Sequence, residues 1–338
     1  MAETKLGQDA VTLPVGTTAQ RPSNPEPGMI RFNTDEGYVE WYDNVGDRWL
    51  ATSFFPGVVA TGGTVTDISQ DGQVFRVHTF TSDDTFDVVR GGEVEYLIVA
   101  GGGGGAGRYG GGGGAGGVLQ GTENVEVDSY SITVGVGGSG GAQTPGECCD
   151  TTRSGNRGNN SSVFGFTAIG GGGGVSNNAA AQNNHNGEED GGSGGGGARA
   201  VEPGTGTAGQ GNDGGDQFSD DLNFGGGGGA GSPGENATVT NTGNGGDGIE
   251  STITGETKFY GGGGAGGSHN PHPDRFGKGG LGGGADAREP GGPVYTGFDG
   301  QANTGGGGGS AVRDGSNSNT GPGGNGGSGI VIVRYRVG

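Results

Sequence analysis

Hydrophobic and polar positions alternate in short stretches near the start of the chain. The alternation occupies residues 30–32 and 39–41, on either side of a turn that closes at Gly37. A period of two is typical of a half-buried β-strand, so the pattern predicts a β-hairpin, with a further strand at 48–50. So small a module buries little surface alone. Its expected attachment or oligomer core comprises Ile30, Phe32, Val39, Trp41 and Trp49.

The same period continues between residues 73 and 100. Alternating stretches at 73–80 and 85–89 predict two more strands, and the nearly continuous apolar run at 94–100 is typical of a strand buried on both faces. The last apolar run of the chain, at 330–335, needs a partner far back in the sequence. Residues 94–99 are the expected partner.

Glycine tracts fill most of the sequence between these two runs, broken by strand-like pieces at 131–134, 163–166 and 249–260. The chain holds 93 glycines, far above the ordinary usage of about 7%. Because each glycine costs a helix about 1 kcal/mol relative to alanine, long α-helices are not expected. The tracts include 101–105, 110–114, 170–174, 225–229, 261–264 and 305–309.

The tracts are too numerous and too closely spaced to be flexible linkers. In a threefold helix of the polyproline II type, glycine lets neighbouring helices pack closely and bond laterally through backbone groups. Collagen needs glycine at every third residue, a register that this chain does not keep. The predicted fold class is mainly β and irregular with almost no α-helix: a β module at 1–62 and a body at 63–338 of short strands and packed glycine helices. Mostly irregular loops are the alternative for the tracts.

Charge and hydropathy narrow the choice of partners. The chain has 17 basic and 37 acidic residues and a net charge of −20, which repels phosphate backbones, so nucleic acid is not an expected partner. No stretch approaches the ~20 apolar residues of a membrane span, so no membrane insertion is expected, and residues 1–10 lack the pattern of a secretion signal, so none is expected. The adjacent Cys148 and Cys149 form no disulfide framework, which leaves free thiols or an interchain bridge.

No catalytic, cofactor or metal motif stands out. Matches to G-x-G-x-x-G are frequent because glycine is frequent, and no helix follows them, so no cofactor is expected. His269 and His272 have no partners at a metal-binding spacing, and the acidic stretch 188–190 is interpreted as a solvated loop. The chain is therefore not expected to be an enzyme.

Four stretches that depart from glycine carry the chemically distinctive side chains: 108–109, 183–190, 268–276 and 294–298. Aromatic and arginine side chains dominate many interfaces, and loops on a rigid scaffold commonly carry function. These stretches are expected to contact a cell-surface glycan or protein; the alternative is that they only cap and space the tracts. The candidate receptor-binding residues are Arg108, Tyr109, His185, His269, His272, Arg275, Phe276, Tyr295 and Phe298.

Several motifs resemble known phage proteins. PVGTTAQRP at 14–22 and GMIRFNT at 28–34, followed by the hairpin, resemble a short module of phage tail and appendage proteins. Five further motifs resemble glycine-rich fibre proteins of marine and other phages: RVHTFTS at 76–82, EYLIVAGGGGG at 95–105, STITGETKFYGGGG at 251–264, ANTGGGGG at 302–309 and the ending GGSGIVIVRY at 326–335. The resemblance covers both ends and most of the middle of the chain, in the expected order.

The resemblance implies a structural protein of the virion, made in the host cytoplasm, which acts as a tail fibre or fibre tip and binds the host surface. Residues 1–62 are expected to attach it to another virion protein, and the chain is expected to pair with itself as a homotrimer. The alternatives are a capsid fibre or decoration protein without a specific receptor, and an ice-binding glycine-helix bundle. The last would need a strictly periodic flat face, against which the irregular charged loops argue.

Overall fold

The computed structural model describes residues 12–43, 47–51, 57–108, 110–142, 153–176, 188–198, 201–218, 223–268, 276–287, 295–312 and 321–337. The chain divides into two compact units. The first comprises Met1–Gly57 with Val337–Gly338, and the second, called the body below, comprises Val58–Arg336. The boundary lies close to the one predicted at residue 62.

The first unit is built on a four-stranded sheet. Its strands are β1 (Val15–Gly16), β2 (Ile30–Asn33), β3 (Tyr38–Asp43) and β4 (Arg48–Ala51), in that order across the sheet. β1 runs parallel to β2, and the other pairs are antiparallel. A short 3-10 helix, η1 (Thr18–Gln20), follows β1. The predicted hairpin and the strand after it are confirmed, with Ile30 opposite Trp41 and Trp41 opposite Leu50.

The body contains a five-stranded antiparallel sheet of order β10-β9-β16-β7-β6, which joins early strands of the body to its last one. Its strands are β6 (Thr64–Gln70), β7 (Gln73–Phe80), β9 (Gly92–Val99), β10 (Val118–Val125) and β16 (Ile330–Arg336). The predicted long-range pairing is confirmed, because β16 lies against β9 with Ile330 opposite Val99. β16 is buried except at Arg336, and β9 is buried from Tyr96 to Val99, as the continuous apolar runs indicate.

Smaller sheets complete the β structure. They are the three-stranded sheet β11 (Ser129–Ile132), β8 (Asp84–Arg90) and β5 (Val59–Thr61), the hairpin β12 (Ser161–Val163) with β13 (Phe166–Ala168), and the hairpin β14 (Ile249–Ser251) with β15 (Lys258–Tyr260). The prediction of one strand-like piece at 163–166 is wrong. Phe164 and Gly165 have positive φ angles of 55° and 81° and form the turn between two strands. The piece at 249–260 is likewise two strands joined by a turn.

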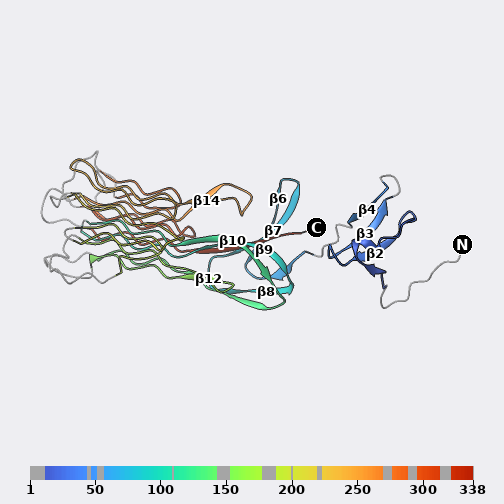
Figure 1. Cartoon of the computed structure of the whole chain (residues 1–338). Coiled ribbons are helices and arrows are strands. Elements are labelled where there is room, and N and C mark those ends of the chain that lie inside the picture. The colour runs from blue at the N-terminus through green and yellow to red at the C-terminus, as the bar shows by residue number, and fades with distance from the viewer. Residues whose placement is uncertain are drawn as a thin grey trace. The chain divides into compact units, whose positions relative to one another are not determined.

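The glycine tracts are packed helices with three residues per turn, as predicted. Figure 1 shows them running side by side, with β9, β10, β12 and β14 at one end. In the tract 100–108, N–H groups three residues apart donate to the same antiparallel neighbour. One series joins Gly101, Gly104 and Gly107 to the carbonyls of Asn159, Asn156 and Arg153. A second joins Gly102, Gly105 and Arg108 to the carbonyls of Gly327, Gly324 and Gly321. The third joins Ala100, Gly103 and Ala106 to the carbonyls of Gly117, Gly114 and Gly111. This period of three matches the polyproline II type of helix, whose backbone bonds all point outward.

Glycine is required in these tracts because of close approach. A Cβ atom placed on Gly103 would lie 2.0 Å from the carbonyl oxygen of Gly172, in a different tract. That oxygen belongs to backbone and cannot rotate away. Lateral hydrogen bonds between tracts therefore take the place of a side-chain core over most of the body.

Candidate functional site

The glycine tracts of the body come together at the end away from the five-stranded sheet. Arg108 closes the tract that leaves β9, and its backbone N–H donates to the carbonyl of Gly321 at 2.9 Å. The N–H of Gly107 reaches the carbonyl of Arg153 at 2.8 Å, and that of Ala311 reaches the carbonyl of Ala106 at 2.9 Å. Tract ends that are far apart in sequence therefore lie next to one another, in what we call the tract end of the body.

A second set of residues joins the same end. The N–H of Gly267 donates to the carbonyl of Gly110 at 2.9 Å, and the N–H of Phe224 donates to the carbonyl of Gly267 at 3.2 Å. Beside them, the buried Ser268 hydroxyl donates to Oδ1 of Asn223 at 3.0 Å. These contacts fix the point at which each tract stops and a connecting segment begins.

Side-chain packing returns at the tract end, in two small clusters. Val175, Ala198 and Phe224 form one cluster, against which Val201 packs. The other cluster consists of three buried residues and two partly buried aromatic residues, namely Ala265, Ala287, Val312, Phe276 and Tyr295. The clusters close off the stacked glycine helices, so the predicted aromatic residues of this second cluster have a structural contact as well as an exposed part.

The structure places the predicted receptor-binding residues unequally. Phe276 and Tyr295 pack on the same cluster, whereas Phe298 is 48% exposed on an outer tract. Arg108 is half-buried and has a positive φ of 67°, at the turn where its tract ends. The remaining predicted residues, namely Tyr109, His185, His269, His272 and Arg275, lie outside the described residues, as do Cys148 and Cys149.

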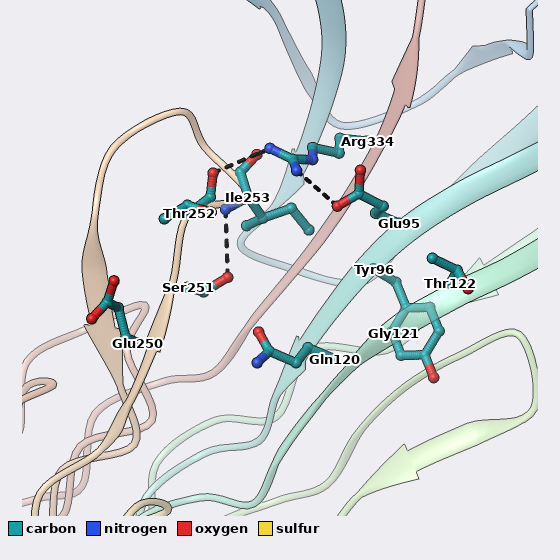
Figure 2. A pocket seen from close by; sticks show the side chains of 10 residues that line it. All are labelled: Glu95, Tyr96, Gln120, Gly121, Thr122, Glu250, Ser251, Thr252, Ile253 and Arg334. Atoms are coloured by element: carbon teal, nitrogen blue, oxygen red, sulfur yellow. Dashed lines mark hydrogen bonds and ion pairs between the residues drawn. The ribbon is translucent and has the colours of Figure 1, made fainter. Parts of the chain in front are cut away.

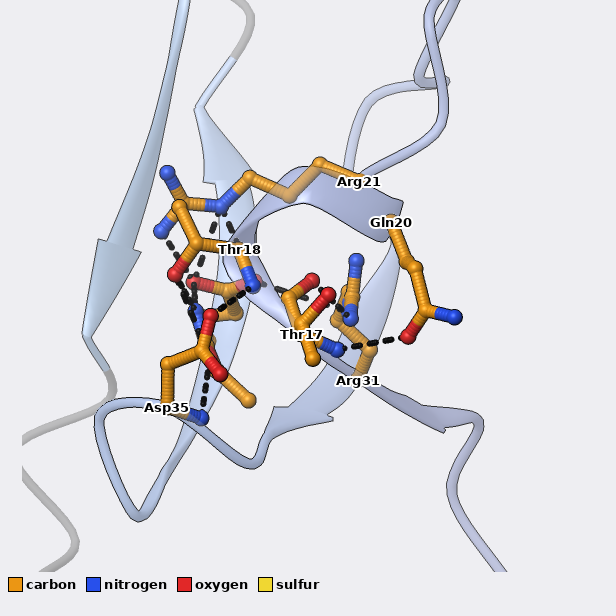
Figure 3. Close-up of polar contacts among 8 residues, drawn as sticks. Thr17, Thr18, Gln20, Arg21, Arg31 and Asp35 are labelled. Carbon is orange, nitrogen blue, oxygen red and sulfur yellow. Dashed lines mark hydrogen bonds and ion pairs between the residues drawn. The ribbon is translucent and has the colours of Figure 1, made fainter.

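The first unit covers one face of its sheet with a polar network, shown in Figure 3. Glu40 is fully buried and accepts a hydrogen bond from Arg21 (Nη2 to Oε2, 2.6 Å) and one from Nδ2 of Asn33 at 3.1 Å. Arg31 lies 3.5 Å from the same carboxylate. The hydrogen bond from Arg21 is the main cause that lowers the pKa of Glu40, and burial acts against it. The carboxylate therefore stays charged and holds the segment of η1 on the sheet.

The opposite face of that sheet carries apolar side chains in the open. Ile30 is 47% exposed and Trp41 36% exposed, and register places Phe32 and Val39 on the same face. Trp49 does not belong to this set, because it lies opposite Tyr42 on the polar face, with ring centroids 5.7 Å apart. Four of the five predicted attachment residues thus share one exposed face, called the apolar face below.

Sequence reasoning missed the polar network. Its signal was present, because Arg31 and Glu40 alternate with the apolar residues and face each other in the register of β2 and β3. Opposite charges at directly paired strand positions attract one another. What the alternation does not tell is which of the two faces is covered by another part of the chain.

Within the described ranges, no group of three or more His, Cys, Asp or Glu side chains is arranged to hold a metal ion. The same ranges contain no helix with the length and apolarity needed to cross a membrane.

The fold and the tract end together define a class of protein: a body of glycine helices joined laterally by backbone hydrogen bonds, whose tract ends meet at one end. Residues 79–336 match a family described as a glycine-rich domain. The chain belongs to this family. A search of curated proteins found no match to the chain.

Proposed function

We propose that this protein is a structural, non-enzymatic component of a bacteriophage particle, a tail fibre or fibre tip that binds the host cell surface. The body presents the tract end to a surface glycan or protein, and the first unit attaches the chain to another virion protein and to further copies of itself, as a homotrimer. The resemblance of the motifs at 14–34, 76–105 and 326–335 to phage fibre proteins supports the phage context.

The observation that carries the adhesive role is the clustering of tract ends. A binding surface needs loops that are held in place by a rigid base. Here the base is fixed by backbone hydrogen bonds in three directions, which persist up to Arg108 and its bond to Gly321. Arg108 and Phe298 add an arginine and an exposed aromatic ring, the side-chain types that dominate many interfaces.

The test begins with the position of the protein on intact phage particles. Gold-labelled antibody against residues 58–336 should decorate the tips of the tail or fibres. Label spread over the head would instead make the protein a capsid decoration, and the adhesive proposal would be withdrawn.

Particles that carry Arg108→Ala together with Phe298→Ala should then bind host cells at least tenfold more weakly than the parent. The matched control is Arg336→Ala with Val136→Ala, which removes one exposed arginine and one exposed apolar side chain at the sheet end of the body. Equal binding by both variants would contradict a role for the tract end.

A further inference from the structure

A cleft of about 400 Å³ opens between the five-stranded sheet and the β14–β15 hairpin. Its size lies within the range of roughly 300–1,000 Å³ found for small-molecule sites. Figure 2 shows the side chains that line it, including Glu95 and Arg334 from the sheet and Glu250 from the hairpin. None of the residues in the cleft belongs to the adhesive proposal above.

The sheet side of the cleft is set by strand register. Glu95 on β9 pairs with Thr122 on β10 and with Arg334 on β16, so the three side chains stand in one row on one face. Gln120 lies two residues before Thr122 and therefore shares this face. The sheet thus brings a carboxylate, a hydroxyl, an amide and a guanidinium into one small area.

Arg334 makes the cleft rigid. Its side chain is only 9% exposed, and its Nη2 donates to Oε2 of Glu95 at 2.7 Å. Its Nη1 donates to Oε1 of Gln70 at 2.8 Å and to the carbonyl of Thr252 in the hairpin at 3.1 Å. Since one guanidinium ties the sheet to the hairpin and orients Glu95, the walls of the cleft are positioned before any ligand arrives.

The hairpin wall is also anchored by apolar contacts. Ile253 and Tyr260 are buried in the same core cluster as Leu97, Val99 and Ile332 of the sheet. The hairpin is therefore held against the sheet both by this cluster and by Arg334. The cleft thus lies between two elements that contact each other directly.

Several polar groups in the cleft have no partner of their own. The side chains of Gln120, Thr122 and Glu250 are exposed and make no hydrogen bond within the described residues. Glu95 accepts the hydrogen bond from Arg334 with Oε2, which leaves its Oε1 available as an acceptor. The cleft therefore offers hydrogen-bond donors from the amide and hydroxyl beside acceptors from two carboxylates.

The charge of the cleft selects the kind of ligand. Glu95 and Glu250 outnumber Arg334, whose charge is already matched by Glu95, and the chain as a whole carries −20. An anion is therefore disfavoured, and a metal ion lacks a third carboxylate or imidazole ligand among the described residues. A hydroxyl group suits the site, because it donates to a carboxylate and accepts from an amide. We propose that this cleft binds a neutral saccharide unit.

The test uses the full chain and ligand-observed saturation-transfer NMR with three neutral hexoses: D-glucose, D-galactose and D-mannose. At least one should receive saturation, and Gln120→Ala with Glu250→Ala should weaken its binding about ten- to hundredfold, as expected for the loss of two hydrogen bonds. D-glucuronate, which adds a carboxylate to a similar ring, should bind more weakly than the best hexose.

A matched control keeps the result specific to the cleft. Asn124→Ala removes an exposed amide from β10, on the same face as Gln120 and outside the cleft, and should leave hexose binding unchanged. Because all the substituted side chains are exposed, unfolding temperatures should stay equal across the set. Absence of saturation for all three hexoses, equal binding by the double variant, or stronger binding of D-glucuronate would each overturn the proposal.

Discussion

Substitution of a single buried glycine tests whether lateral backbone packing holds the body together. The change is Gly103→Ala, in the middle of the tract that leaves β9. The added Cβ would lie 2.0 Å from the carbonyl oxygen and 2.5 Å from the carbonyl carbon of Gly172. Ordinary contact begins at 3.4 Å, so the tract at 170–174 has to move away by about 1.4 Å.

The size of the effect follows from the hydrogen bonds that such a shift breaks. The N–H groups of Gly171 and Gly174 donate to the carbonyls of Gly101 and Gly104, each at 2.9 Å, and an added 1.4 Å takes both beyond hydrogen-bond distance. A buried donor or acceptor left unpaired costs about 1–3 kcal/mol, so each of the two broken bonds costs at least this much. The free energy of unfolding should therefore fall by about 2–6 kcal/mol, a large part of the ~5–15 kcal/mol that stabilises a typical protein.

Thermal unfolding followed by calorimetry measures this loss. At roughly 2–4 °C for each kcal/mol in a unit of this size, the midpoint should fall by at least ~4 °C. Ala106→Gly is the matched control in the same tract, since it removes a buried methyl group and costs about 1–2 kcal/mol. A midpoint for Gly103→Ala no lower than that of the control would refute the close-packing argument.

Three further predictions concern the two units. Glu40→Gln should lower the stability of the first unit by about 1.5–3 kcal/mol, typical of hydrogen bonds to a charged group. The pKa of Glu40 is lowered in the folded protein, chiefly by the hydrogen bond from Arg21, so the parent should lose stability as the pH falls below the unfolded pKa of ~4.3 and through the folded pKa. The variant should lack this loss. Urea unfolding followed by tryptophan fluorescence measures both effects. Burial lowers the pKa of His78, so the body should lose stability as the pH falls below ~6.5, and His78→Gln should remove that dependence of the thermal midpoint. Ile30→Glu with Trp41→Glu should convert an oligomer held by the apolar face into monomers in sedimentation velocity, and an unchanged sedimentation coefficient would exclude that face as the contact.

The sequence was sufficient to predict the strands that have few alternatives. The run at 330–335 is one of two long apolar runs in the chain, and pairing it with the other at 94–99 leaves neither exposed. The hairpin at 30–41 was predictable for a similar reason, because a period of two on both sides of Gly37 admits one register. Membership of the glycine-rich domain family was predictable as well, since numerous glycine tracts are the feature that describes this family.

The neighbours of each glycine tract were not predictable from sequence. Gly103 donates to Gly114 and accepts from Gly308, but no side chain distinguishes these tracts from the one that holds Gly227. The positions of the flanking strands and turns determine which tracts become neighbours. The turn at Phe164 and Gly165 was missed because two short strands joined by a tight turn have the same apolar content as one longer strand.

The stability of the body comes from backbone hydrogen bonds between the tracts. The lateral bonds of the tract 100–108 are complete at Arg108, and each is made by backbone groups whatever sequence follows. Lengthening a connection between two fixed tract ends costs only ~0.6 kcal/mol for each doubling of its length. A side chain added inside a tract, as at Gly103, costs several times more. Changes in chain length and chemistry are therefore tolerated at the tract end and excluded from the tracts, as the proposed binding role requires.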